Sequence, residues 1–199
     1  MDENVVKAVK FIRQWMAEHP VANDLAPMYE AYNSYGREYI SQALIGIEPW
    51  KYMSYIPNNS FKNISEIEEV NLRSDVSHIG ESAFDNCTHL KKIIIPDSVK
   101  SIEQSAFFNC IDLRSVFIGN SVKLIEGATF RWCDNLSEVT LSRGITFIDS
   151  CAFANCDVLT TIAFNGTKED WSKITLHPDW CHDSPIEKII CTDGIIEIN

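Results

Sequence analysis

The densest group of side chains that could carry chemistry lies near the C-terminal end of the sequence: His177, Asp179, Cys181, His182 and Asp183. Such residues can bind a metal ion, or form a pair in which a histidine activates a cysteine nucleophile. However, the order His-x-x-x-Cys-His matches no zinc signature, and the segment reads as a loop, where polar residues are common. We therefore predict no catalytic residue, no metal site, no cofactor and no enzymatic activity.

Four cysteines recur at a fixed interval of 23 residues, and a column of thiols could also suggest a metal: Cys87, Cys110, Cys133 and Cys156. Zinc sites use close local pairs of the C-x₂₋₄-C kind, and these cysteines stand one per interval. Ile64 occupies the same place one interval earlier, so the position calls for a small buried hydrophobe. We expect four reduced, buried and metal-free thiols. Cys151, which lies two residues before a phenylalanine, reads as a small residue at a tight corner.

The 23-residue spacing of the cysteines is part of a longer repeat that extends through the whole central region of the sequence. Phenylalanine recurs every 23 residues at positions 61, 84, 107, 130 and 153. Six further apolar positions follow each phenylalanine at offsets of 3, 6, 9, 11, 15 and 18, and Lys168 is the one exception among the five units, with Trp171 in the last position. A single unit cannot bury these side chains alone, so neighbouring units must stack on one another.

Within each unit, a short segment alternates apolar and polar residues, as in Leu90 to Ile95. This period of two predicts a short strand with one buried face. We expect parallel strands near residues 69–73, 92–96, 115–119, 138–142 and 161–165, one per unit. The stretch from Pro96 to Ile102 shows no such alternation, and turns or short helical pieces are expected there.

The run A-F-D-N-C-T-H-L-K-K-I-I-I-P-D-S-V-K-S-I (83–102) resembles the BspA-type leucine-rich repeat family, whose units read A-F-x-x-C-x-x-L-x-x-I-x-I-P-x-S-V-x-x-I. The resemblance covers about residues 56–165, and the tail resembles the module that often closes such arrays. It implies a leucine-rich-repeat solenoid, α/β and horseshoe-like, with one short parallel β-strand per 23-residue repeat. Family members are commonly bacterial or protozoan surface proteins that adhere to other proteins, which implies a surface or secreted location.

The regions on either side of the array are expected to cover its ends. Residues 1–55 are predicted to form an N-terminal α-helical cap, because apolar residues recur at helical spacing over 3–18 and tyrosines follow at positions 29, 32, 35 and 39. The repeat array is expected over 56–171, in about five units. A C-terminal cap is expected over 172–199, where isoleucines flank a turn at Thr192-Asp193-Gly194.

Composition and charge disfavour some classes of binding partner and some cellular locations. The formal net charge is −11, which disfavours nucleic acid and anionic membranes because both bind basic surfaces. The first residues interrupt every apolar run with a charge and lack the apolar region of a signal peptide. The cysteine count is seven, an odd number that disfavours a disulfide framework. These features favour a cytoplasmic location.

We interpret the chain as a non-catalytic protein-binding or scaffolding module that presents the concave face of its sheet to a partner protein. The middle residue of each strand should point outward, and the residues predicted on this face are Asn71, Ile94, Phe117, Thr140 and Ala163. Lys91, Lys92 and Arg114 are expected to form a basic edge beside them. Weak association of two copies through Ile94 and Phe117 is a further possibility. The alternative is carbohydrate or small-molecule binding through aromatic residues such as Tyr29, Tyr32, Trp132 and Trp180.

Overall fold

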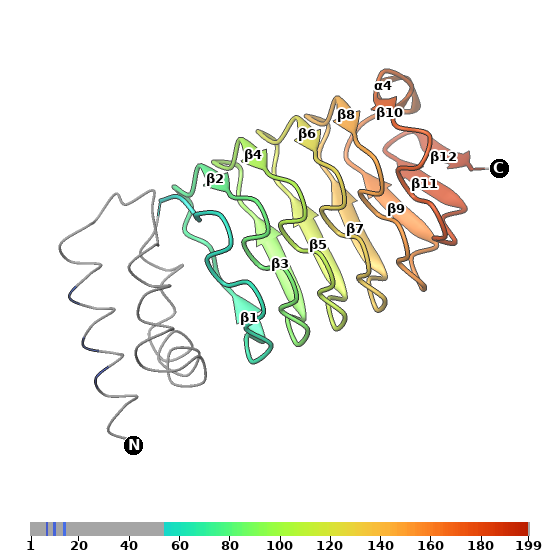
Figure 1. Ribbon diagram of the computed structural model, residues 1–199. Helices are drawn as coiled ribbons and strands as arrows, with labels where there is room; N and C mark the ends of the chain where they lie inside the picture. Colours follow the sequence, from blue (N-terminus) through green and yellow to red (C-terminus); the bar gives the residue numbers. More distant parts are fainter. Residues whose placement is uncertain (1–6, 8–9, 11–13, 15–53, 199) are drawn as a thin grey trace.

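The computed structural model describes residues 54–198, together with Lys7, Lys10 and Gln14. Figure 1 shows the described chain as a row of stacked turns that runs from β1 to β12. The predicted N-terminal helical cap lies almost wholly outside the described residues. The described part of the chain therefore comprises chiefly the repeat array and the C-terminal segment.

One parallel sheet runs the length of the array, as predicted. Its strands lie inside all five expected ranges and fill four of them almost completely, but β1 has only two paired residues. Neighbouring strands are parallel throughout, except for the last, β12, which returns antiparallel to β11. The seven strands, in spatial order, are β1 Glu69–Val70, β3 Lys92–Ile95, β5 Ser115–Ile118, β7 Glu138–Leu141, β9 Thr161–Phe164, β11 Lys188–Cys191 and β12 Gly194–Glu197.

A second parallel sheet was not predicted from the sequence. Its strands are β10 Thr175–Leu176, β8 Phe147–Ile148, β6 Leu124–Ile125, β4 Ser101–Ile102 and β2 His78–Ile79. Each has only two residues, too few to show an alternation, so the expectation of turns or helical pieces up to Ile102 was wrong at the end of that stretch. Ile56 extends this sheet by a single bridge to Ile79. Both sheets continue into the segment 172–198 through β10, β11 and β12.

The core between the two sheets is formed by the repeated apolar positions. All of them are buried except Leu72, which is half-buried, and Lys168, which is exposed. The five phenylalanines have no exposed surface and stack on one another, with ring centroids 5.1 to 5.4 Å apart along the column. Trp180 closes the column with an edge contact to Phe153 at 6.2 Å. Each phenylalanine therefore packs against both neighbouring turns, which makes the repeats mutually dependent.

The corner around each phenylalanine needs two residues in the left-handed conformation. The position two residues before the phenylalanine has φ between 52 and 57° in every unit: Asn59, Ser82, Ser105, Ala128 and Cys151. The position two residues after it has φ between 55 and 62°: Asn63, Asn86, Asn109, Trp132 and Asn155. Asparagine tolerates this conformation well because its short side chain can form local hydrogen bonds. Cys151 thus lies at a tight corner, as predicted.

The regular count of 23 breaks after β9, where the short helix α4 (Lys168–Ser172) is inserted. Trp171 lies on this helix and is buried, but Leu176 takes the strand position that the count had assigned to Trp171, because Leu176 pairs with Ile148. The predicted place of Trp171 in the repeat was therefore wrong. Lys168 is exposed for the same reason, since it begins the helix instead of filling a core position.

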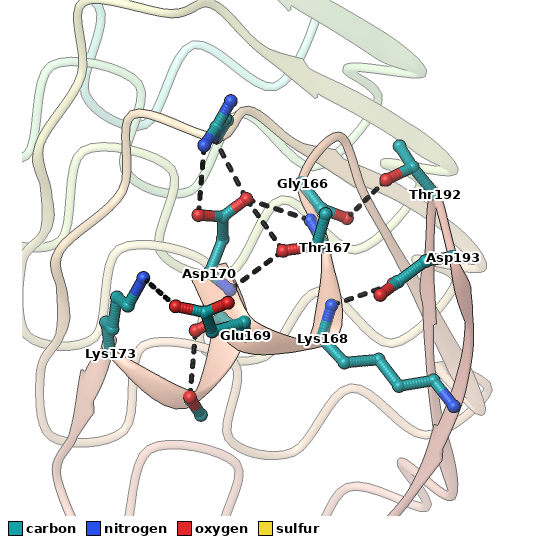
Figure 2. A network of polar contacts seen from close by, with 10 residues as sticks. Gly166, Thr167, Lys168, Glu169, Asp170, Lys173, Thr192 and Asp193 are labelled. Atoms are coloured by element: carbon teal, nitrogen blue, oxygen red, sulfur yellow. Dashed lines mark hydrogen bonds and ion pairs between the residues drawn. The ribbon is translucent and has the colours of Figure 1, made fainter.

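A polar network fixes α4 to the last two strands (Figure 2). Asp170 accepts hydrogen bonds from the Thr167 backbone N–H at 3.0 Å and from the Thr167 hydroxyl at 2.9 Å, and it forms an ion pair with Arg143 at 3.0 Å. The Lys168 backbone N–H donates to Asp193 Oδ1 at 2.8 Å, in the turn between β11 and β12. These bonds satisfy the helix terminus and hold the closing hairpin in place.

Candidate recognition surface

The outward residues of the seven-stranded sheet line up in register across the strands. Ile94 pairs with Phe117, Phe117 with Thr140, and Thr140 with Ala163. Their side chains lie on the face opposite the core, where Ile94 is 50% exposed and Phe117 is 38% exposed. Asn71 follows directly after β1 and is exposed, one step beyond the pair Val70 and Ile93. The structure thus brings the predicted residues into one line.

The line continues over two further strands that the sequence analysis did not include. Ile190 of β11 pairs with Ala163 of β9, and Ile195 of β12 pairs with Ile190. Both isoleucines are large and exposed, at 46% and 50%. We call the six residues together the uncharged row: Ile94, Phe117, Thr140, Ala163, Ile190 and Ile195.

Ile190 was missed because the insertion of α4 places it 27 residues after Ala163 instead of 23. A signal for it is nevertheless present in the sequence. The segment Lys188-Ile189-Ile190-Cys191 repeats the pattern of Lys92-Ile93-Ile94-Ile95 almost letter for letter. Aligning segments by pattern instead of by a fixed count would have found it.

A line of polar residues, some basic and some acidic, runs beside the uncharged row, at the start of the parallel strands and at the end of β12. Lys92 pairs in register with Glu69 on one side and Ser115 on the other, and Lys188 pairs with Glu197. Lys91 forms an exposed ion pair with Glu68 at 2.6 Å. The interaction lowers the pKa of Glu68, first through the hydrogen bond from Lys91 and then through its charge.

The prediction that this edge is basic was therefore wrong. Arg114 is exposed, as expected, but Lys91 and Lys92 both stand next to glutamates. Exposed ion pairs of this kind contribute little to stability, so their main effect is on the surface charge. The result is a polar border of mixed charge, not a basic one.

The four column cysteines are buried and unpaired, as predicted. Each thiol also donates a hydrogen bond to the backbone carbonyl of the phenylalanine 26 residues earlier. The four Sγ to oxygen distances are 3.2 to 3.3 Å, for Cys87 to Phe61, Cys110 to Phe84, Cys133 to Phe107 and Cys156 to Phe130. The position thus offers more than space for a small hydrophobe, since the thiol gives the phenylalanine carbonyl a hydrogen bond that an isoleucine side chain could not donate. Burial raises the pKa of all four thiols, to about 12 for Cys156.

In the segment around His177, each histidine lies near an aspartate. His177 lies near Asp179, with Nδ1 and Oδ2 4.0 Å apart, and His182 Nε2 lies 3.1 Å from Asp183. Within residues 172–198, no hydrogen bond joins the Cys181 thiol to either histidine. Burial raises the pKa of Cys181, whereas a cysteine nucleophile needs a lowered pKa. Among the described residues, no group of three or more His, Cys, Asp or Glu side chains is arranged to hold a metal ion.

The aromatic residues predicted for carbohydrate or small-molecule binding differ in their exposure. Tyr29 and Tyr32 lie outside the described residues. Trp180 is buried, at 6% exposure, and packs against Phe153 and Trp171, so the prediction that it could face a ligand was wrong. Trp132 is 42% exposed and lies in a turn outside both sheets.

Comparison with known proteins identifies the same repeat. The sequence model of the BspA type leucine rich repeat region matches residues 54–176 in six copies. The chain belongs to the BspA-type leucine-rich repeat family. The match includes one copy more than the five units counted in the sequence, and its ends coincide with the bridge at Ile56 and with β10. No curated protein matches the chain.

Two solved structures illustrate the family fold. A leucine-rich repeat protein of T. pallidum is 30% identical, with a TM-score of 0.54, over 56% of this chain and 52% of its own. A leucine-rich repeat protein of Eubacterium ventriosum is 22% identical, with a TM-score of 0.52, over 73% of this chain and 46% of its own. The chain spans about half the length of each. In the described part of the chain, no helix is long and apolar enough to cross a bilayer.

Proposed function

We propose that this leucine-rich repeat chain is a non-catalytic recognition module that binds a partner protein with the exposed face of its seven-stranded sheet. The observation that carries the proposal is the uncharged row. Four of its six side chains are large, apolar and exposed, and none of the six carries a charge. Exposed apolar residues gathered in one place mark protein contact surfaces far more often than scattered ones do.

The dimensions and the surroundings of the row suit a protein partner. Six neighbouring strands at the usual spacing of about 4.8 Å span roughly 24 Å from the first to the last. That length accommodates a helix or an extended segment of another protein. The border of mixed charge beside it, from Lys92 to Glu197, resembles the polar rim that surrounds the apolar centre of many interfaces.

The test is affinity capture with the double variant Ile94→Ser and Phe117→Ser. Both side chains point away from the core, so the fold should survive the substitutions. Val158→Ser is the matched control, because Val158 is equally exposed, at 47%, but lies in a turn outside both sheets. We expect a protein captured by the native chain and by the Val158 variant to be lost from the double variant.

The same variants separate a foreign partner from a second copy of the chain. If the row binds another copy, sedimentation velocity of the purified native chain will show association that the double variant lacks. Identical captured proteins and identical sedimentation for all three chains would contradict the proposal. The cytoplasmic location stays a prediction.

A further inference from the structure

Trp132 combines two features that are unfavourable for the stability of the fold. It is 42% exposed, and its backbone has a φ of 62°, in the left-handed region that bulky residues avoid. The neighbouring turn imposes this conformation, because the Trp132 backbone N–H donates to the Ala154 carbonyl at 3.1 Å, as Asn109 does to Arg131 one turn earlier. The indole is therefore held outward on a strained corner.

The residue also interrupts a ladder of asparagine side chains. Asn86 donates to Asn63 at 2.8 Å and Asn109 donates to Asn86 at 2.6 Å, so three successive turns are linked through this column. Trp132 stands where the next asparagine would continue the ladder toward Asn155. Within the described residues, the side-chain oxygen of Asn109 and the side-chain amide of Asn155 consequently make no hydrogen bond to the protein.

Two further defects lie beside Trp132. Among the described residues, the buried side-chain polar atoms without a hydrogen-bond partner are Arg131 Nε and Asp134 Oδ1. The Arg131 guanidinium lies over the indole, 5.9 Å from the ring centroid. Unsatisfied buried polar atoms are rare in native folds and call for an explanation. Here a strained backbone, a broken ladder and both orphan atoms fall within residues 131–134 of an otherwise regular array.

Local departures from an otherwise consistent pattern tend to mark functional sites, since selection for stability alone would remove them. We propose that Trp132, with Arg131, Asp134, Asn109 and Asn155 around it, forms a binding site for one ring of a neutral saccharide. The C–H face of a pyranose packs on an exposed indole. Its hydroxyl groups both donate and accept, which matches the amide groups of the two asparagines on either side.

The charges at the site favour a neutral ligand over the alternatives. Arg131 Nε and Asp134 Oδ1 are themselves closed to a ligand, but both side chains are only partly buried and carry opposite charges, so the site favours neither an anion nor a cation over a neutral ligand. A nucleotide base could stack on Trp132, but its phosphates would oppose a net charge of −11. The asparagines on either side of Trp132 are two turns apart, about 10 Å at the usual strand spacing, so a sugar ring that packs on the indole lies between their two amide groups.

The variant Trp132→Asn tests the first half of the argument, because asparagine should relieve the strained corner and restore the ladder. We expect its melting temperature to lie about 2–4 °C above that of the native chain, as a gain of 1 kcal/mol gives for this size. A melting temperature equal to or below the native value would overturn the inference, since Trp132 would then not be kept at the expense of stability.

Binding is tested by titrating the native chain with cellotriose, maltotriose and chitotriose at millimolar concentrations. The heat of binding is measured by calorimetry, and the change in tryptophan fluorescence is recorded in parallel. We expect at least one of them to bind, with at least tenfold loss in Trp132→Asn. Trp132→Phe should retain part of the affinity, and Ile94→Ser on the sheet should retain all of it. Absence of binding to all three, or equal binding by Trp132→Asn, overturns the proposal. Loss of a captured protein from Trp132→Asn without sugar binding would instead make Trp132 a protein contact and also overturn it.

Discussion

Removal of one ring from the phenylalanine column should destabilise several repeats at once. Phe107 has no exposed surface, and its ring lies 5.3 Å from Phe84 and 5.4 Å from Phe130, within 4° of parallel to both. The substitution Phe107→Ala removes a fully buried ring and both stacking contacts. The backbone around it is held by hydrogen bonds to Thr129 and Cys133, so the site has little freedom to collapse into the cavity.

The expected cost is about 3–5 kcal/mol, the range for emptying a buried phenylalanine site. Loss of the stacking geometry favours the upper part of that range, since an aromatic pair contributes about 0.5–1.5 kcal/mol beyond its buried area. For a chain of this size, the melting temperature should fall by roughly 6–20 °C, at 2–4 °C per kcal/mol. Circular dichroism during thermal and urea unfolding measures the change.

Phe117→Ala is the matched control, because the same side chain is lost ten residues later from an exposed strand position. Phe117 is 38% exposed, so its removal leaves no closed cavity and should cost about 1–2 kcal/mol, a part of the full burial energy. Hydrogen exchange should show that Phe107→Ala loosens the turns on both sides of residue 107. An equal loss from both variants, or a thermal melt unchanged by Phe107→Ala, would refute the register of the core.

Three further predictions concern charge and thiols. The pKa of Glu126 is raised, first by burial and then by the nearby charges of Glu103, Asp149 and Glu81. Its ionised form therefore destabilises the fold. Glu126→Gln should melt at a higher temperature than the native chain at pH 7, and the difference should vanish below about pH 4, where the carboxyl group is protonated in both the folded and the unfolded chain. Hydrogen bonds from Thr167 and then the charge of Arg143 lower the pKa of Asp170, so its contribution is present above about pH 4 and lost on further acidification. Asp170→Asn should therefore melt lower at pH 7 and approach the native value in acid. Alkylation of the native chain at pH 8, followed by mass spectrometry, should leave Cys87, Cys110, Cys133 and Cys156 unmodified, and unfolding should expose all seven cysteines; modification of the column in the folded chain would contradict its burial.

The sequence predicted the parts of the fold that repeat without interruption. Five phenylalanines at a constant interval fix the register of the core, and the alternation around Ile93 and Ile95 locates the main strands. The second sheet escaped detection because strands of two residues, such as Ser101–Ile102, have no period to detect. Their pairing depends on the stacking of the turns, which is a property of the folded chain.

The candidate surface was predicted in part, and the reasons differ from residue to residue. Ile94 and Phe117 follow from the alternation of side chains along a strand. Ile190 was missed because α4 shifts the count, although the letters around it repeat those around Ile94. The strain at Trp132 depends on a left-handed φ that no single residue reveals, but a tryptophan in a column of asparagines was visible in the sequence.

Photo-crosslinking from within the uncharged row measures most directly whether this face binds a partner. A benzophenone amino acid placed at position 117 lies on β5, the third of the seven strands, and the same group at position 158 lies on a turn outside both sheets. If the sheet face is the recognition surface, irradiation of the complex will join the partner, or a second copy of the chain, to position 117 and not to position 158. Adducts from position 158 alone, or equal adducts from both positions, would contradict the account.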